Sequence, residues 1–154
     1  MNLEIERKFL VRDMRWKAIG QGVSLRQGYL SSHPDRIVRV RIEGDAAVMT
    51  IKGRTVGATR GEWEYPIPLD DARVFLDRLC EKPIIEKTRY RIPFQGMVWE
   101  VDEFHGDNAG LVVAEIELTS EDQSFDKPDW IGEEVTHDSR YFNANLLRHP
   151  FSNW

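Results

Sequence analysis

The sequence predicts a mainly β, α+β domain in which eight antiparallel strands close into a β-barrel with a few flanking helices. Charged and apolar residues alternate along many short segments, as in a strand whose two faces meet different surroundings. Short turn signals separate most of these segments, which favours antiparallel pairing between neighbours. Only two segments have the apolar spacing of a helix. Eight antiparallel strands are enough to close on themselves.

Eight segments are predicted to be strands: residues 3–12, 24–31, 36–43, 47–53, 61–67, 84–93, 97–104 and 111–119. The third and fourth form a hairpin around the turn Gly44-Asp45. Residues 54–60 are rich in Gly and Thr and are predicted to be a flexible loop.

Two segments are predicted to be helices. Asp70 or Asp71 can cap a helix that runs to about Cys80. Asp138 can cap a last helix of roughly ten residues, which ends at the sequence Arg148-His149-Pro150. These helices are candidate covers for the outward-facing apolar residues of the strands. A partner subunit would serve equally well, so a homodimer stays open.

Composition indicates a single domain over residues 1–154, with 41% apolar and 31% charged residues and a formal net charge of −5. Without a basic excess there is no counterion release to attract nucleic acid. No apolar run approaches membrane-spanning length, and the charged N-terminus is unlike a signal peptide. We therefore expect a cytoplasmic protein with neither a nucleic acid nor a membrane as partner.

The charged residues of the strands share one phase and are largely segregated by sign. The acidic set is Glu4, Glu6, Glu62, Glu64, Glu100, Asp102, Glu115 and Glu117. The basic set is Lys8, Arg39, Arg41, Lys52, Lys87, Arg89 and Arg91. Exposed cross-strand ion pairs are the plainest explanation, but solvated faces would mix the signs. Charges that face inward need partners or a ligand, because burying them alone is costly.

The two sets together indicate a cavity for a metal-bound polyphosphate. Several carboxylates suit Mg²⁺ or Mn²⁺, which prefer oxygen ligands. Clustered Arg and Lys suit phosphate oxygens. The four histidines lie outside these rows, and no Cys/His spacing indicates zinc. The sequence also has no P-loop and no nucleophile elbow.

An ordered set of motifs runs along nearly the whole chain. It comprises Glu4-x-Glu6-x-Lys8, Arg39-x-Arg41, Lys52 in Thr-Ile-Lys-Gly, Glu62-x-Glu64, Glu86-Lys87-Thr-Arg89-Tyr90, Asp102, Glu115-x-Glu117 and Glu134-Val-Thr-x-Asp138-x-Arg140-Tyr141. In this order the motifs resemble the CYTH superfamily, the triphosphate tunnel metalloenzymes. The resemblance implies an eight-stranded antiparallel tunnel that binds a triphosphate with a divalent metal. The short single-domain form is most similar to small bacterial members that hydrolyse inorganic tripolyphosphate.

The resemblance also implies roles for individual residues. The phosphate chain would be bound by Lys8, Arg39, Arg41, Lys52, Lys87 and Arg89, with Lys52 and Arg41 as catalytic candidates that stabilise the leaving phosphoryl group. One or two Mg²⁺ or Mn²⁺ ions would be held by Glu4, Glu6, Asp102, Glu115 and Glu117. Glu62 and Glu64 would orient the basic residues or join the metal site.

Two further residues have open roles. Tyr29 is either a catalytic proton acceptor, with a phenolate favoured by neighbouring Arg and Lys, or a packing tyrosine. Arg140 either closes one tunnel mouth and touches the substrate or lies on a helix surface.

Several activities fit this sequence. Metal-dependent hydrolysis of the terminal phosphate of a triphosphate, most simply inorganic tripolyphosphate, is the expected function. A class IV-type adenylate cyclase, or a thiamine or nucleoside triphosphatase, would use the same scaffold. A non-catalytic polyphosphate- or nucleotide-binding module would keep the basic wall and could lose the acidic one. A lipocalin-like carrier would need an apolar lumen, which the phase of the charges disfavours.

Overall fold

The computed structural model describes residues 2–154 and consists mainly of strands. The strands are β1 (Leu3–Val11), β2 (Gly22–His33), β3 (Arg36–Glu43), β4 (Ala46–Gly53), β5 (Thr59–Pro66), β6 (Ile85–Phe94), β7 (Met97–Phe104), β8 (Val112–Leu118) and β9 (Ile131–Glu134). The helices are α1 (Leu69–Val74), which continues as a π-helical stretch (Phe75–Leu79), and α2 (Asn143–Leu146). Short 3-10 turns lie at Arg15–Ala18, Gly106–Asn108, Ser139–Tyr141 and Phe151–Asn153. All eight predicted strands are present, with ends within about two residues of the predicted ones.

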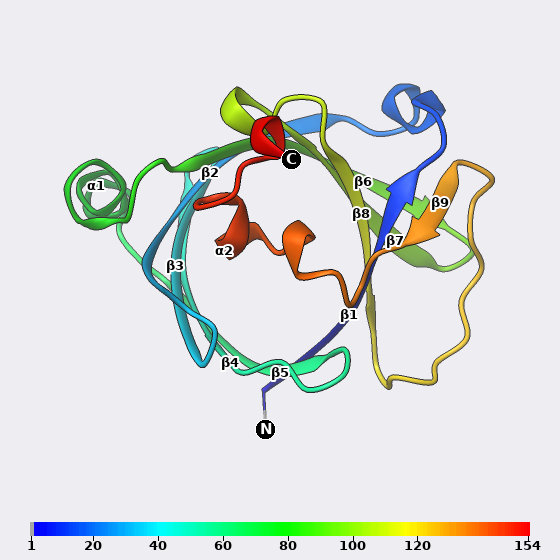
Figure 1. Cartoon of the computed structure of the whole chain (residues 1–154), viewed down its shortest axis with the longest axis horizontal. Coiled ribbons are helices and arrows are strands. Elements are labelled where there is room, and N and C mark those ends of the chain that lie inside the picture. Colours follow the sequence, from blue (N-terminus) through cyan, green and yellow to red (C-terminus); the bar gives the residue numbers. More distant parts are fainter. Residues whose placement is uncertain (1) are drawn as a thin grey trace.

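The strands form one antiparallel sheet in the order β5-β4-β3-β2-β6-β7-β8-β1-β9. A further pairing, in which Leu3 of β1 lies opposite Gly61 of β5, joins the two sides of this sheet into a ring of eight strands (Figure 1). The ninth strand, β9, pairs with the other half of β1, where Phe9 lies opposite Glu134. The predicted antiparallel architecture with few helices is confirmed, and β9 is an addition to it.

The outward faces of the ring are covered in two places. Beside β3 and β4, Ala72 and Leu76 of the first helical segment pack on Val40 and Ile42. This confirms the predicted covering role of that helix. Asp70 and Asp71 lie inside its first turn rather than at the cap position, which Pro68 occupies. Acidic side chains are favourable there because the helix N-terminus carries partial positive charge.

Aromatic residues cover the outward face of β1, β7 and β8. Phe9 and Trp99 meet edge to face with ring centroids 5.5 Å apart, and Trp130 packs beside them. Phe9 alternates with the inward-facing Lys8 along β1, so one strand separates an aromatic core from a charged interior.

The C-terminal residues do not form the predicted continuous helix. Asp138 caps a 3-10 turn, with its carboxylate accepting from the Arg140 N–H at 3.1 Å, and α2 has only four residues. Phe142 between them has extended backbone, with φ −71° and ψ 129°. This break lets both Tyr141 and Leu146 join a cluster of buried residues that line one end of the ring. Figure 1 shows the segment, orange to red, lying across the opening of the ring.

At that end of the ring the interior is apolar, whereas the rest of the interior is charged. On five strands, an apolar residue of the cluster lies two positions from an inward-facing charged residue and therefore also faces inward. The pairs are Leu10 and Lys8, Ile37 and Arg39, Ile85 and Lys87, Phe104 and Asp102, and Val113 and Glu115. The C-terminal segment therefore buries an apolar end of the interior, and the charged part lies behind it. The second predicted helix was expected to cover outward-facing apolar residues of the strands. The C-terminal segment does cover apolar residues, but these lie on the inside of the sheet.

Within residues 2–154, no helix combines the length and the apolar character needed to cross a bilayer.

Candidate active site

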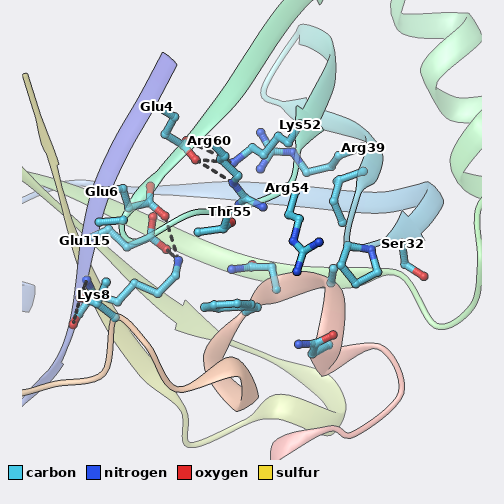
Figure 2. A pocket seen from close by; sticks show the side chains of 18 of the residues that line it. Glu4, Glu6, Lys8, Ser32, Arg39, Lys52, Arg54, Thr55, Arg60 and Glu115 are labelled. Carbon is cyan, nitrogen blue, oxygen red and sulfur yellow. Dashed lines mark hydrogen bonds and ion pairs between the residues drawn. The ribbon is translucent and has the colours of Figure 1, made fainter. Parts of the chain in front are cut away.

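The charged residues of the strands face two adjoining cavities inside the ring, of about 250 Å³ and about 180 Å³. The two cavities share lining residues: Glu4, Glu6, Arg39, Lys52, Arg89 and Glu115. The larger one reaches the C-terminal segment and the loop that carries Arg54 and Thr55 (Figure 2). The smaller one continues toward the opposite end of the ring.

Most of the residues predicted as site residues come together here. The larger cavity also has Lys8, Tyr29 and Lys87 in its wall, and the smaller one has Arg41, Glu62, Glu64 and Glu117. Asp102 and Arg140 line neither of these cavities within residues 2–154. Period-two alternation brings the others inward, because every second side chain of a strand points to the same face.

Two lysines are each held between carboxylates. Lys52 Nζ lies 3.1 Å from both oxygens of Glu4 and 3.3 Å from Glu62 Oε2. Lys8 Nζ lies 3.0 Å from Glu6 Oε1 and 2.9 Å from Glu115 Oε1. Figure 2 shows the two groups of contacts next to each other, with Glu4 and Glu6 two residues apart on β1. Such bonds fix the ammonium groups in place before any ligand arrives.

These contacts shift pKa values in opposite directions. Burial lowers the pKa of Lys8, but Glu115 and Glu6 outweigh it and raise the pKa well above its ordinary value. Burial raises the pKa of Glu4, but Lys52, hydrogen bonding with Glu62 and the charge of Arg60 bring it down to about 2. Burial and the neighbouring Glu4 carboxylate raise the pKa of Glu62 to about 7.

The contacts of Glu62 and Glu64 favour one of their two predicted roles. Glu62 pairs with Lys52. Glu64 Oε2 accepts from Thr50 Oγ1 at 3.3 Å, and Thr50 Oγ1 accepts from Arg39 Nη2 at 3.2 Å. Both carboxylates therefore orient basic side chains of the wall.

Three guanidinium groups gather where the two cavities meet. Burial and the positive charges of Arg39 and Arg89 lower the pKa of Arg41. Arg39 Nε has no hydrogen-bond partner within residues 2–154 although it is buried. Positive groups that disfavour one another in this way are stabilised by a bound anion.

Asp102 lies behind the cavity lining, among the basic residues of the wall. It is fully buried, with Oδ1 2.7 Å from Arg89 Nε and Oδ2 2.8 Å from Lys87 Nζ. Lys87 and Arg89 outweigh burial and lower the pKa of Asp102. Both of its oxygens are thus occupied by cations, so Asp102 holds two basic residues of the wall in place. Its predicted role as a metal ligand stays a prediction.

Tyr29 is buried in the apolar cluster at one end of the ring. Burial raises its pKa, and this outweighs the opposite effect of Arg39, Arg60 and Lys8. Its hydroxyl accepts from Gln27 Nε2 at 3.3 Å. Burial therefore opposes the expected phenolate, and of the two open roles the surroundings of Tyr29 favour packing. Its own O–H stays available as a donor toward the larger cavity.

Arg140 lies on the surface. Its guanidinium pairs with Asp138 at 2.7 Å and lies 5.0 Å from the ring centroid of Trp154. Of the two roles predicted for Arg140, this position fits a surface residue and not one that closes the tunnel mouth.

Several lining residues of the larger cavity escaped the sequence prediction, among them Arg60 and Asn143. Arg60 Nε lies 3.3 Å from Glu4 Oε1, in the wall of the larger cavity. It shares the strand phase of Glu62 and Glu64, so it would have been found if the predicted strand had begun earlier. Asn143 also lines this cavity. No sequence pattern marks it, because it arrives from the C-terminal segment.

A distant loop fixes the segment that leads to Arg60. The carboxylate of Glu121 accepts from the Ala58 N–H at 2.8 Å. Gly57 has a φ of +64°, and a Cβ there would lie 2.5 Å from Glu121 Oε1. The positive φ favours glycine at this position, whereas the flexible Glu121 side chain could move away from a Cβ.

The carboxylate chemistry of the interior fits a hard divalent cation. Within residues 2–154, no three His, Cys, Asp or Glu side chains are already grouped as a metal site. Partial burial and the carboxylates of Glu4, Glu6 and Glu100 raise the pKa of Glu117. Mutually repelling oxygen donors are what Mg²⁺ or Mn²⁺ would stabilise.

Comparison with known proteins gives consistent similarities. The CYTH domain model matches residues 2–151. The chain is 51% identical over 154 residues to an inorganic triphosphatase of Acetivibrio thermocellus, covering 100% of this chain and 99% of that protein. It is 41% identical over 148 residues to an inorganic triphosphatase of Nitrosomonas europaea, covering 93% and 95%.

Solved structures agree with this. The crystal structure of an inorganic triphosphatase is 38% identical, with a TM-score of 0.66 over 93% of this chain and 96% of that one. A putative adenylate cyclase from Bacillus halodurans is 19% identical, with a TM-score of 0.59 over 79% and 84%. At that identity the second similarity concerns the fold alone.

Proposed function

This chain belongs to the CYTH domain family, and we propose on that basis that it hydrolyses the terminal phosphate of a triphosphate, most simply inorganic tripolyphosphate, with Mg²⁺ or Mn²⁺. The observation that carries the proposal is the interior of the ring, where buried Lys and Arg side chains face carboxylates across a continuous pair of cavities. The names of the two relatives, at 51% and 41% identity, support the substrate.

The basic residues of the wall would bind the phosphate chain. These are Lys8, Arg39, Lys52, Arg60, Lys87 and Arg89 in the larger cavity, with Arg41 in the smaller one. Carboxylates already orient most of them, so little reorganisation is needed when charge builds up on the phosphoryl group in the transition state. The unpartnered Arg39 Nε and the O–H of Tyr29 are further donors for phosphate oxygens.

The residues that would hold the metal are Glu4, Glu6, Glu115 and Glu117. A bound Mg²⁺ or Mn²⁺ would neutralise phosphate charge and lower the pKa of an attacking water. Glu62 and Glu64 lie beside this set and keep Lys52 and Arg39 directed at the same space.

The test is phosphate release from tripolyphosphate, ATP and thiamine triphosphate, each with Mg²⁺, with Mn²⁺ and with EDTA. We expect metal-dependent orthophosphate release, fastest from tripolyphosphate. Pyrophosphate and a cyclic nucleotide from ATP would instead make the protein a cyclase. Binding of tripolyphosphate without turnover under any of these conditions would make it a binding module.

Glu117→Gln isolates the metal requirement. Glu117 is the metal candidate whose pKa is raised, so its charge can be removed without stranding a buried lysine. The metal concentration for half-maximal rate should rise by roughly tenfold, because one charged oxygen donor becomes a neutral amide. The metal-free variant should unfold at the same or a slightly higher temperature, since repulsion is relieved. An unchanged metal requirement would remove Glu117 from the site.

Lys87 should impose an alkaline limit on substrate binding. Burial and the charge of Arg89 lower its pKa to about 8, although Asp102 and Glu115 act in the opposite direction. Above that pH the free protein loses this positive charge, so KM for tripolyphosphate should rise. We would measure KM from about pH 7 to about pH 9.5. In Lys87→Met, KM should be high at every pH and this rise absent; if the rise persists, another group causes it.

A further inference from the structure

The C-terminal segment, residues 139–147, reaches the charged interior as well as the apolar end of the ring. Tyr141, Leu146 and Leu147 are buried in the cluster that contains Tyr29 and Ile37. These apolar contacts hold the segment in place independently of any polar contact. Between them, Asn143 turns a polar side chain toward the strands and lines the larger cavity.

The side-chain oxygen of Asn143 accepts two hydrogen bonds from the ring. Lys87 Nζ donates to Asn143 Oδ1 at 2.9 Å, and Gln27 Nε2 donates to the same oxygen at 3.1 Å. A lysine ammonium can only donate, so the oxygen of the amide must face it. Gln27 Nε2 also donates to the Tyr29 hydroxyl at 3.3 Å. One atom of the C-terminal segment is thereby connected to two groups of the cavity wall.

The geometry leaves Lys87 with one donor for a ligand. An ammonium has three N–H groups. One reaches Asp102 Oδ2 at 2.8 Å and a second reaches Asn143 Oδ1. No third acceptor is present among residues 2–154, and Lys87, only 2% exposed, lines the larger cavity. Two fixed bonds on different sides of Nζ determine the direction of the third.

We propose that Asn143 is a positioning residue for substrate binding: its Oδ1, together with Asp102, directs the remaining N–H of Lys87 at a phosphate oxygen in the larger cavity. The proposal rests on the proposed function and assigns a part of it to the C-terminal segment. Closure of the apolar end and orientation of a phosphate-binding lysine are then performed by the same short stretch of chain.

The test is a double-mutant cycle on steady-state hydrolysis of tripolyphosphate, with wild type, Asn143→Ala, Lys87→Met and the double variant. Asn143→Ala should raise KM by roughly tenfold with kcat changed by less than about threefold, because a ground-state contact to phosphate is misdirected. If Asn143 acts through Lys87, adding Asn143→Ala to Lys87→Met should change kcat/KM by less than about twofold. A further tenfold loss in the double variant would overturn the proposal.

Leu147→Ala is the matched control. Leu147 belongs to the same segment and is buried in the apolar cluster, but it does not line the larger cavity. Its loss should lower the unfolding temperature without the selective rise in KM. If Asn143→Ala behaves in the same way as this control, its role is only structural and the proposal fails.

The design separates this proposal from the proposed function. Wild type that does not hydrolyse tripolyphosphate overturns both. Wild type that is active, with Lys87→Met impaired and Asn143→Ala unchanged in KM, overturns the positioning role alone.

Discussion

Lys52→Ala should lower kcat/KM for tripolyphosphate by roughly 100-fold or more, the loss typical of removing one preorganised electrostatic donor. Lys52 lines both cavities, and its side chain is only 7% exposed. Its Nζ is placed by Glu4 and Glu62, so its charge meets the phosphate chain without reorganisation. The measurement is steady-state phosphate release at saturating metal, with the fold checked by circular dichroism.

Lys17→Ala is the control for removing a lysine that also pairs with a carboxylate. Lys17 contacts Glu103 at 3.0 Å on the surface, with its side chain 46% exposed. It should keep the wild-type rate. Lys52→Arg retains the positive charge and should recover part of the activity lost in Lys52→Ala. A folded Lys52→Ala variant with a normal rate would remove Lys52 from the phosphate site.

Asp102→Asn should destabilise the fold by about 3–5 kcal/mol, the usual cost of breaking a buried ion pair from one side. The carboxylate is fully buried between Lys87 and Arg89, so the variant leaves two buried cations with a neutral amide. The measurement is the free energy of unfolding from denaturant titration. Activity should fall as well, because Lys87 would lose its proton more readily without Asp102.

The pH dependence of this effect has a definite sign. The folded protein lowers the pKa of Asp102 below its unfolded value. Asp102 therefore contributes its full stabilisation of the fold above its unfolded pKa of about 4. This stabilisation is lost as the pH falls toward the lower pKa that Asp102 has in the folded protein. The difference between wild type and Asp102→Asn should be constant at neutral pH and shrink in acid.

Glu103→Gln is the matched control on the same strand. Glu103 is next to Asp102 but pairs with Lys17 on the outside of the ring. Exposed pairs contribute about 0–1 kcal/mol, so this variant should be close to wild type. Equal losses from Glu103→Gln and Asp102→Asn would show that the buried pair adds nothing special to stability.

The strands and their charged rows could be predicted because alternation is a local property. Glu4, Glu6 and Lys8 face the cavity as two-residue spacing predicts. The cavity residue Arg60 was placed in the loop because the strand was predicted to begin at residue 61. An error of two residues at a strand end was enough to hide a cavity residue.

Roles that depend on partners could not be predicted in the same way. Asp102 has the phase and chemistry of a metal ligand, but Lys87 and Arg89 take both of its oxygens. Tyr29 has cations nearby, but its burial outweighs them. In both cases the deciding quantity is a balance of desolvation and charge among residues far apart in the sequence.

The sequence by itself determined the antiparallel strands, the sign of each charged row and the inward direction of most site residues, because these follow from spacing along a single strand. Only the tertiary structure decided which charges neutralise one another and which remain for a ligand. It also decided that residues 139–147 close one end of the ring and bring Asn143 to Lys87. Burial and pairing depend on the whole ring, and strand periodicity does not record what lies across it.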